Sequence, residues 1–207
     1  MIRLNPRYSL KREKLFFESL SKKFEIPRKI TLDVGCGYGF FTDLLDQMGH
    51  EAYGIDLDKE VIFAATKNFK LNFLIGDSTR LPFSDNAFDV ILCRGLSVFY
   101  REIYEDVSEQ REHLLDLLKK DGYLVFITST NLSGQKTTIQ NHKFIDVSSF
   151  FTKPNLETSI YFFFAQGILF KIFGVNAFSS IFTKMSILLA KITKRSGYVV
   201  CIVKKLK

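Results

Sequence analysis

The chain has 207 residues, of which 46% are hydrophobic and 25% are charged, so it can form one globular domain with a sizeable core. Its three cysteines are far apart and form no C-x-x-C pair, which excludes a disulfide framework and a cysteine zinc site. The N-terminus is polar and lacks the apolar stretch of a signal peptide, so we expect a cytoplasmic protein.

The net charge of +7 is concentrated near the C-terminus. Residues 158–207 contain no Asp or Glu, and their basic residues are Lys171, Lys184, Lys191, Lys194, Arg195, Lys204, Lys205 and Lys207. Such asymmetry indicates either an anionic partner or surface, or a solvated basic face that aids solubility. Nucleic acid is the less favoured partner, because aliphatic residues interrupt the basic ones and no RNA-binding motif is present.

The first part of the chain alternates between predicted helices and strands. An amphipathic helix at 10–24 comes first. Short β-rich runs predict strands at 30–34, 52–55, 72–75, 88–93 and 123–128. Helices follow the first, second and fourth strands, and the last of them should end at Asp121-Gly122. This alternation predicts a parallel sheet, whose ligands bind at the carboxyl ends of its strands.

The pattern changes beyond residue 130. Residues 156–163 and 198–203 are rich in β-branched and aromatic residues and predict two more strands. The segment between them is too long for a hairpin loop and contains helical apolar stripes, so we expect one or two helices there. Residues 161–182 carry only one charge, Lys171, but contain several polar residues, and we interpret them as buried or interfacial instead of membrane-spanning.

A glycine-rich turn follows the first predicted strand, with the sequence Asp33-Val34-Gly35-Cys36-Gly37-Tyr38-Gly39. Glycines at such a turn let the backbone bend sharply and let a ligand approach the main chain. Dinucleotide-binding enzymes use a similar turn, G-x-G-x-x-G. The Asp33 carboxylate would repel a pyrophosphate but attract an ammonium or a sulfonium group. We therefore expect S-adenosylmethionine as cofactor, because it is a nucleoside with both cations and no phosphate.

Two more acidic residues end the next two predicted strands. Asp56 ends the second strand, where doubly wound nucleotide sites place the acceptor for the ribose hydroxyls. Its alternative role is to cap the next helix, although Asp58 suits that role at least as well. Asp77 ends the third strand and can accept a hydrogen bond from an adenine amino group. Three neighbouring strands would then each present one carboxylate at the same edge of the sheet.

These motifs resemble those of class I methyltransferases of the type 11 group. The resemblance rests on residues 32–39, on Ile55-Asp56 and on the long motif at 76–90, and it covers residues 28–130. The chain departs from the family at Lys120-Asp121-Gly122, where Pro-Gly-Gly is usual. The resemblance implies an α/β fold with a Rossmann-like, doubly wound sheet, mostly parallel with an antiparallel last strand and with helices on both faces.

The resemblance also implies which residues hold S-adenosylmethionine. The expected contacts come from Asp33, Gly35, Cys36, Gly37, Gly39, Asp56, Leu57, Asp77, Ser78, Cys93 and Arg94. Asp33 would face the ammonium group, Asp56 would hold the ribose diol, and Asp77 would meet the adenine edge. Methyl transfer is an in-line displacement that needs alignment more than acid-base catalysis. Should a base be required, His142 and Tyr100 are the candidates, and no metal-ligand cluster is visible.

We expect a single domain over residues 1–207, made of an entry helix (1–27), a cofactor-binding core (28–130) and an acceptor or lid region (131–207). The last region holds a Phe-rich, basic insert at 165–195, where the family usually has a modest loop. This insert could complete the core, cover an apolar acceptor pocket or lie at a membrane surface. The last two roles predict a hydrophobic or lipid-like acceptor.

The sequence thus predicts a methyltransferase that produces S-adenosylhomocysteine and acts on a small-molecule acceptor. Two alternatives remain at this point. A NAD-dependent oxidoreductase is compatible with the glycine turn alone. A membrane-associated protein that binds the cofactor without catalysis is compatible with the insert.

Overall fold

The computed structural model describes residues 10–26, 29–96, 108–130, 151–164, 166–193 and 197–206. The strands within these residues are β1 (Ile30–Val34), β2 (Glu51–Asp56), β3 (Asn72–Ile75), β4 (Phe88–Arg94), β5 (Leu118–Thr130), β6 (Leu156–Phe163) and β7 (Gly197–Lys205). The helices are α1 (Leu10–Phe24), α2 (Phe40–Gln47), α3 (Lys59–Asn68), α5 (Ser108–Asp116), α7 (Gln166–Phe173), the short 3-10 helix η1 (Gly174–Ala177) and α8 (Ser180–Thr193).

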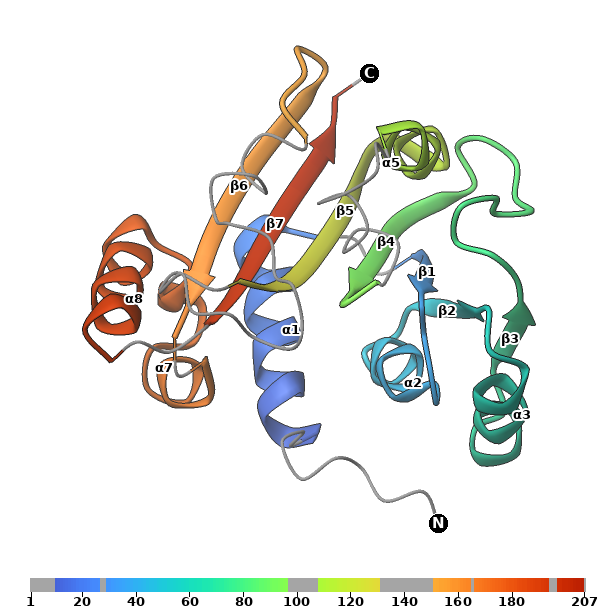
Figure 1. Ribbon diagram of the computed structural model, residues 1–207, viewed down its shortest axis with the longest axis horizontal. Coiled ribbons are helices and arrows are strands. Elements are labelled where there is room, and N and C mark those ends of the chain that lie inside the picture. Colours follow the sequence, from blue (N-terminus) through green and yellow to red (C-terminus); the bar gives the residue numbers. More distant parts are fainter. Residues whose placement is uncertain are drawn as a thin grey trace.

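All seven strands belong to one sheet, in the order β3-β2-β1-β4-β5-β7-β6. The five strands from β3 to β5 are parallel, whereas β7 is antiparallel to both β5 and β6. The strand order reverses between β1 and β4, which is the switch point where doubly wound sheets bind ligands. The predicted mostly parallel sheet with an antiparallel last strand is confirmed (Figure 1).

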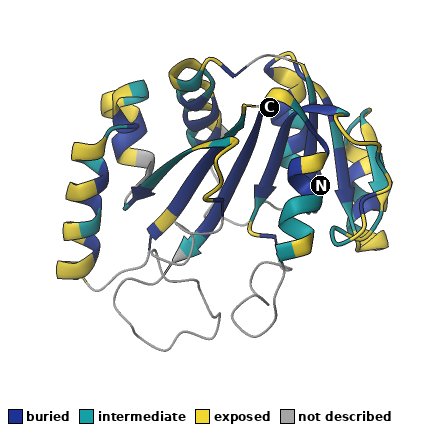
Figure 2. Ribbon diagram, turned by 90° about the horizontal axis from the view of Figure 1, so that it is seen from above, coloured by how far each residue is buried: buried dark blue, intermediate teal, exposed yellow. Residues whose placement is uncertain are grey.

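Helices cover both faces of the sheet. One apolar cluster joins one face to α1, α2 and α7, and a second cluster joins the other face to α5 and α8. The strands between them are mostly buried (Figure 2). The predicted insert therefore wraps around the edge strand β6, with α7 on one side and α8 on the other. It lies at one end of the sheet, and α3 lies at the opposite end (Figure 1).

Much of the Phe-rich character serves packing between α1 and the insert. The ring of Phe16 in α1 lies 5.2 Å from that of Phe170 and 5.7 Å from that of Phe178. Phe163 at the end of β6 touches the same two rings, at 5.0 and 5.3 Å. All four rings are buried. One side of the insert thus completes the core, as one of the three predicted roles requires.

The helix before β5 ends earlier than the sequence predicts. It ends at Asp116, and Leu118 is already part of β5, paired with Phe88. The Asp121-Gly122 signal marks instead an irregularity in β5, where the pairing shifts between Phe88 and Val90. Asp121 has a positive φ of 61°, which bends the strand at that point. The Asp121-Gly122 pair therefore marks a bulge within β5 and not the end of the preceding helix.

The apolar segment at 161–182 is not one continuous helix. It comprises the end of β6, all of α7 and η1, and the start of α8. Among the described residues, no helix is long and apolar enough to cross a membrane.

Candidate cofactor site

The glycine-rich turn connects β1 to α2 at the carboxyl edge of the sheet. Gly35, Gly37 and Gly39 all have positive φ values, between 52° and 79°. At Gly39 a Cβ atom would lie 2.6 Å from the ring of Phe73, so no side chain fits there. At Gly37 a Cβ atom would meet nothing within 4 Å, so the backbone there is open to an approaching ligand. The turn is thus tightly packed on its inner side and accessible at its tip.

Asp56 at the end of β2 holds this turn in place. Its Oδ2 atom accepts a hydrogen bond from the Gly37 N–H at 2.8 Å, and its Oδ1 atom accepts one from the Asp58 N–H at 3.0 Å. The neighbouring carbonyl of Ile55 accepts the N–H groups of Gly35 and Cys36. Asp58, and not Asp56, caps α3, because its carboxylate accepts the N–H groups at the start of that helix. The predicted division of roles between the two acids is compatible with this geometry.

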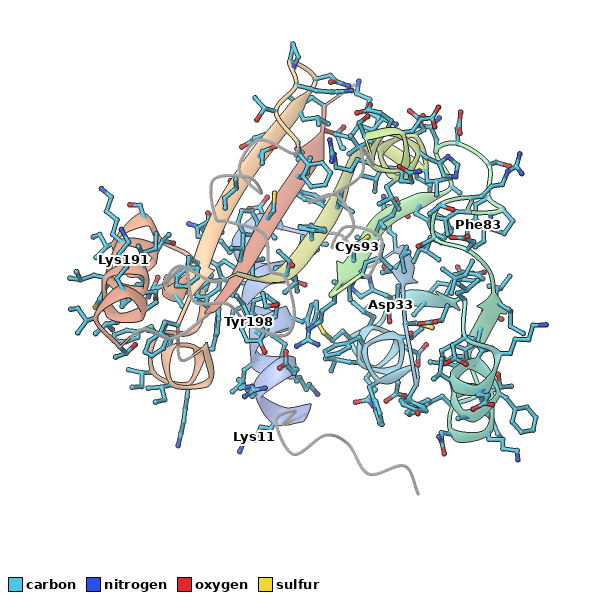
Figure 3. All side chains as sticks on the ribbon, viewed as in Figure 1. Lys11, Asp33, Phe83, Cys93, Lys191 and Tyr198 are labelled. Carbon is cyan, nitrogen blue, oxygen red and sulfur yellow. The ribbon has the colours of Figure 1, made fainter. Side chains whose placement is uncertain are left out.

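Asp33 near the end of β1 is a buried carboxyl group, only 2% exposed. Its Oδ2 atom accepts a hydrogen bond from the Thr42 hydroxyl of α2 at 2.7 Å. Burial raises the pKa of Asp33 to about 7, against the lowering effects of Thr42 and of the Arg94 charge. A cation bound beside Asp33 would favour its ionised form, so this environment suits an ammonium group. Asp33 and Cys93 both lie within the sheet in Figure 3.

The third carboxylate lies just beyond β3, the neighbour of β2. Asp77 is exposed, and its Oδ1 atom accepts the Thr79 N–H at 2.8 Å, which shapes the turn after the strand. Ser78 next to it is half-buried. Leu57 is 66% exposed beside Asp56, so its side chain is available to an adenine ring. Because β3, β2 and β1 are adjacent, the structure brings the three predicted acids to one sheet edge.

Arg94, the last residue of β4, turns toward α1. Its Nη2 atom lies 3.7 Å from Glu13 Oε1, and its guanidinium group lies 4.3 Å from the centre of the Phe41 ring. Glu13 is buried and also pairs with Arg12 at 2.9 Å. The entry helix is thereby connected to the strand end that borders the cofactor edge.

The two cysteines among the predicted contacts are buried thiols. Cys93 is fully buried in the core, and Cys36 is almost so. Burial is the main cause that raises both thiol pKa values above their ordinary range, so neither is a ready nucleophile. Any contact of Cys93 with a ligand would therefore come from its backbone.

Two residues of this site were missed by the sequence reasoning. Glu13 lies three and four residues before Phe16 and Phe17, on the apolar face of the predicted helix. An acidic residue on an apolar face is the sequence signal that could have identified it. Thr42 interrupts the apolar face of α2 in the same way. The predicted bases His142 and Tyr100 lie outside the described residues. Within those residues, no group of three or more His, Cys, Asp or Glu side chains could hold a metal ion.

Comparisons with known proteins agree with this geometry. Residues 32–126, which run from β1 to β5, match the family model described as "Methyltransferase domain". Residues 32–126 are therefore similar to the methyltransferase domain that this model describes. This match agrees with the predicted cofactor, S-adenosylmethionine.

The proteins to which this chain is similar include two bacterial ones. It is 29% identical over 102 residues to "Uncharacterized methyltransferase YcgJ" of Bacillus subtilis, covering 46% of this chain and 39% of that protein. It is 31% identical over 107 residues to phthiotriol/phenolphthiotriol dimycocerosates methyltransferase 1 of Mycobacterium ulcerans, covering 49% and 38%. The chain thus spans about two fifths of the length of these relatives.

A solved structure extends the likeness of fold to nearly the whole chain. The plantazolicin methyltransferase BpumL, in complex with a monoazolic desmethylPZN analog and SAH, matches with a TM-score of 0.67 and 19% identity. The match covers 96% of this chain and 84% of that one. SAH is S-adenosylhomocysteine, the product that S-adenosylmethionine leaves after methyl transfer. None of these three proteins is named as a dehydrogenase.

Proposed function

We propose that this protein is an S-adenosylmethionine-dependent methyltransferase whose acceptor is a hydrophobic, lipid-like small molecule. The observation that carries the first part is the sheet edge of β1, β2 and β3. There the buried Asp33 and the exposed Asp77 lie at the ends of the two strands that flank β2, and Asp56 accepts the N–H of Gly37, whose backbone is open. This set favours a cationic nucleoside and disfavours a pyrophosphate.

Each predicted contact has a role that its environment supports. Asp33 orients the ammonium group, while Gly35, Gly37 and Gly39, with the Cys36 and Cys93 backbone, border the methionine chain. Asp56 accepts the ribose hydroxyls, and Leu57 packs on the adenine. Asp77 and Ser78 meet the adenine edge, and Arg94 balances the charge of Asp33. The bound cofactor supplies an activated methyl group on a sulfonium, so the protein mainly aligns it with the acceptor.

Two observations support a hydrophobic acceptor. One relative bears the name of a dimycocerosates methyltransferase, which denotes a lipid-like substrate of that protein. In this chain, the insert places many apolar side chains at one end of the sheet, and several of them are exposed. For the removal of a proton from the acceptor, His142 and Tyr100 remain the proposed bases. The variants His142→Ala and Tyr100→Phe should then lower kcat without changing the affinity for SAH.

Calorimetry with SAH and with NAD tests the proposed cofactor site. We expect SAH to bind and NAD not to bind, because the pyrophosphate of NAD would face Asp33. Binding of NAD alone would reverse the assignment. An untargeted screen for methylated products, made by comparing lysates incubated with active protein and with the Asp56→Ala variant, would then identify the acceptor.

A further inference from the structure

The insert has a second side that faces away from the core. Its large apolar side chains there are exposed, and we call them the insert surface: Ile168, Ile172, Ile181, Met185, Leu188 and Ile192. The rings of Phe173 and Phe182 lie 4.5 Å apart and connect α7 to α8. Exposed residues follow the outward sides of the helices at the left of Figure 2. A concentration of large exposed apolar side chains on two connected helices is typical of an interaction site.

Helix α8 is inverted relative to an ordinary surface helix. Its buried side consists of Thr183, Ser186 and Ala190. Its outward side carries Ile181 and Ile192, which are 74% and 69% exposed. The Thr183 and Ser186 hydroxyl oxygens are buried and have no hydrogen-bond partner among the described residues. A helix in water would place these groups the other way round, so the outward side is built for an apolar contact.

Basic residues flank the insert surface. Lys171, Lys184 and Lys191 are all exposed, and Lys191 lies on the outer part of α8 in Figure 3. Lys184 and Lys191 are seven residues apart, so they lie on one side of α8, next to the apolar stripe. Neither α7 nor α8 contains an acidic residue. An apolar stripe bordered by lysines is complementary to lipid chains and anionic headgroups.

The ends of the insert lie at the cofactor edge of the sheet. Because β6 runs in the same direction as β5, the end of β6 at Phe163 lies at the carboxyl edge of the parallel strands. Gly197, the start of β7, pairs with Thr130 at the carboxyl end of β5. Both α7 and α8 are therefore joined by short connections to the edge that carries Asp33 and Asp56.

We propose that the insert surface docks the protein on an anionic lipid bilayer, with the isoleucines and leucine in the acyl region and the three lysines at the headgroups. This docking holds the cofactor edge near the membrane, where a lipid-like acceptor would be presented. The docking itself depends only on the insert surface, whereas its value for catalysis rests on the proposed methyltransferase function.

Vesicle co-sedimentation tests the apolar part of the proposal. The probe is phosphatidylcholine vesicles containing about one third phosphatidylglycerol, a strongly anionic surface. The 207-residue protein should pellet with them, and Ile181→Ser/Ile192→Ser should lower the partition coefficient about tenfold or more. The matched control is Phe63→Ser/Leu206→Ser, which removes exposed apolar side chains elsewhere and should pellet like the original protein. Equal pelleting of the two double variants would overturn the proposal.

The role of the three lysines is tested with the variant Lys171→Gln/Lys184→Gln/Lys191→Gln. This variant should lose about tenfold in its preference for anionic over neutral vesicles. The control Lys14→Gln/Lys22→Gln/Lys23→Gln removes the same charge from exposed positions on α1 and should keep that preference. Loss of preference in both variants would show that net charge, and not the insert surface, attracts the protein.

Two further measurements separate the other outcomes. Calorimetry with SAH should give the same affinity for Ile181→Ser/Ile192→Ser as for the original protein, which shows that the variant is folded. A protein that pellets but binds no SAH would retain the docking and lose the proposed function. Failure of the original protein to pellet would overturn the docking. So would a dimer in sedimentation velocity that the same double variant dissociates, because a second copy would then cover the surface.

Discussion

The first βα unit and helix α8 differ in whether their buried polar groups form hydrogen bonds. Around β1 and α2, the buried Thr42 hydroxyl donates to Asp33, and the Asp56 carboxylate accepts a backbone N–H of the turn. In α8, the buried hydroxyls of Thr183 and Ser186 have no partner within the described residues, and apolar side chains face outward. These polar groups of the first βα unit form hydrogen bonds within the chain, whereas the two buried hydroxyls of α8 do not among the described residues.

This difference separates a region that its own contacts explain from one that requires a partner. A paired polar network is stable in a folded chain, because no buried group loses its hydrogen bond. An inverted helix is unfavourable in water on both sides, since hydroxyls are desolvated and apolar surface is hydrated. The cofactor edge can therefore be understood from the isolated chain, whereas α8 is understood only with a surface against it.

The largest effect should come from Gly39→Ala in the first βα unit. A Cβ at a φ of 79° and 2.6 Å from the Phe73 ring adds backbone strain to a steric clash. We expect the free energy of unfolding to fall by about 3 kcal/mol, measured by urea denaturation. Gly37→Ala is the control, since its Cβ meets nothing within 4 Å. It should cost only about 1 kcal/mol of stability but should weaken SAH binding. Equal destabilisation by both variants would contradict the packing argument.

A pair of threonine variants tests the contrast directly. Thr42→Val removes the hydrogen bond to Asp33 and should lower the free energy of unfolding by about 2 kcal/mol. Thr183→Val replaces a buried hydroxyl without a hydrogen-bond partner in the described chain and should raise it by about 1 kcal/mol. Chemical denaturation of both variants measures the two changes. If both variants changed the free energy of unfolding in the same direction, the contrast between the two regions would be refuted.

Asp56→Ala should weaken SAH binding more than tenfold, a loss of at least about 1.4 kcal/mol. The substitution removes the proposed ribose acceptor and the hydrogen bond that holds the Gly37 N–H. Isothermal titration calorimetry gives the affinity. Asp58→Ala, which uncaps α3, is the control and should lower stability by about 1 kcal/mol while leaving SAH affinity unchanged. An unaltered dissociation constant for Asp56→Ala would refute the ribose role.

The affinity for SAH should rise with pH around neutrality. Burial raises the pKa of Asp33 to about 7 in the ligand-free protein, so the carboxyl group is largely protonated below that pH. An ammonium group favours the carboxylate, so binding releases a proton, and affinity should increase about fivefold between about pH 6 and about pH 7. Titrations in two buffers of different ionisation enthalpy measure the proton release. Asp33→Asn should bind more weakly and show no such dependence.

The same pKa has a consequence for stability in the absence of ligand. The folded-state pKa of Asp33 lies above the ordinary value of 3.8, so the folded protein holds this proton more tightly than the unfolded chain. The contribution of Asp33 to stability is therefore full below about pH 4 and is lost as the pH rises through about 7. Denaturation curves across this range should show a smaller decline for Asp33→Asn than for the original protein.

The sequence by itself determined the strands, the glycine turn and the meeting of three acids at one edge. These features follow from local pattern, because strand runs are contiguous and right-handed βαβ crossovers place successive parallel strands side by side. The wrong helix end predicted at Asp121-Gly122 also has a local cause, because the same residue pair occurs at helix ends and at bulges within strands.

The tertiary structure alone decided the contacts between distant segments and the orientation of α8. The Glu13–Arg94 pair joins α1 to the end of β4, and no spacing in the sequence encodes that contact. An apolar stripe has the same periodicity whether it faces the core or the solvent. Phe162 of β6 and Ala190 of α8 belong to the same buried cluster, so the small residues of α8 pack inward beside β6, whereas Ile181 and Ile192 are exposed.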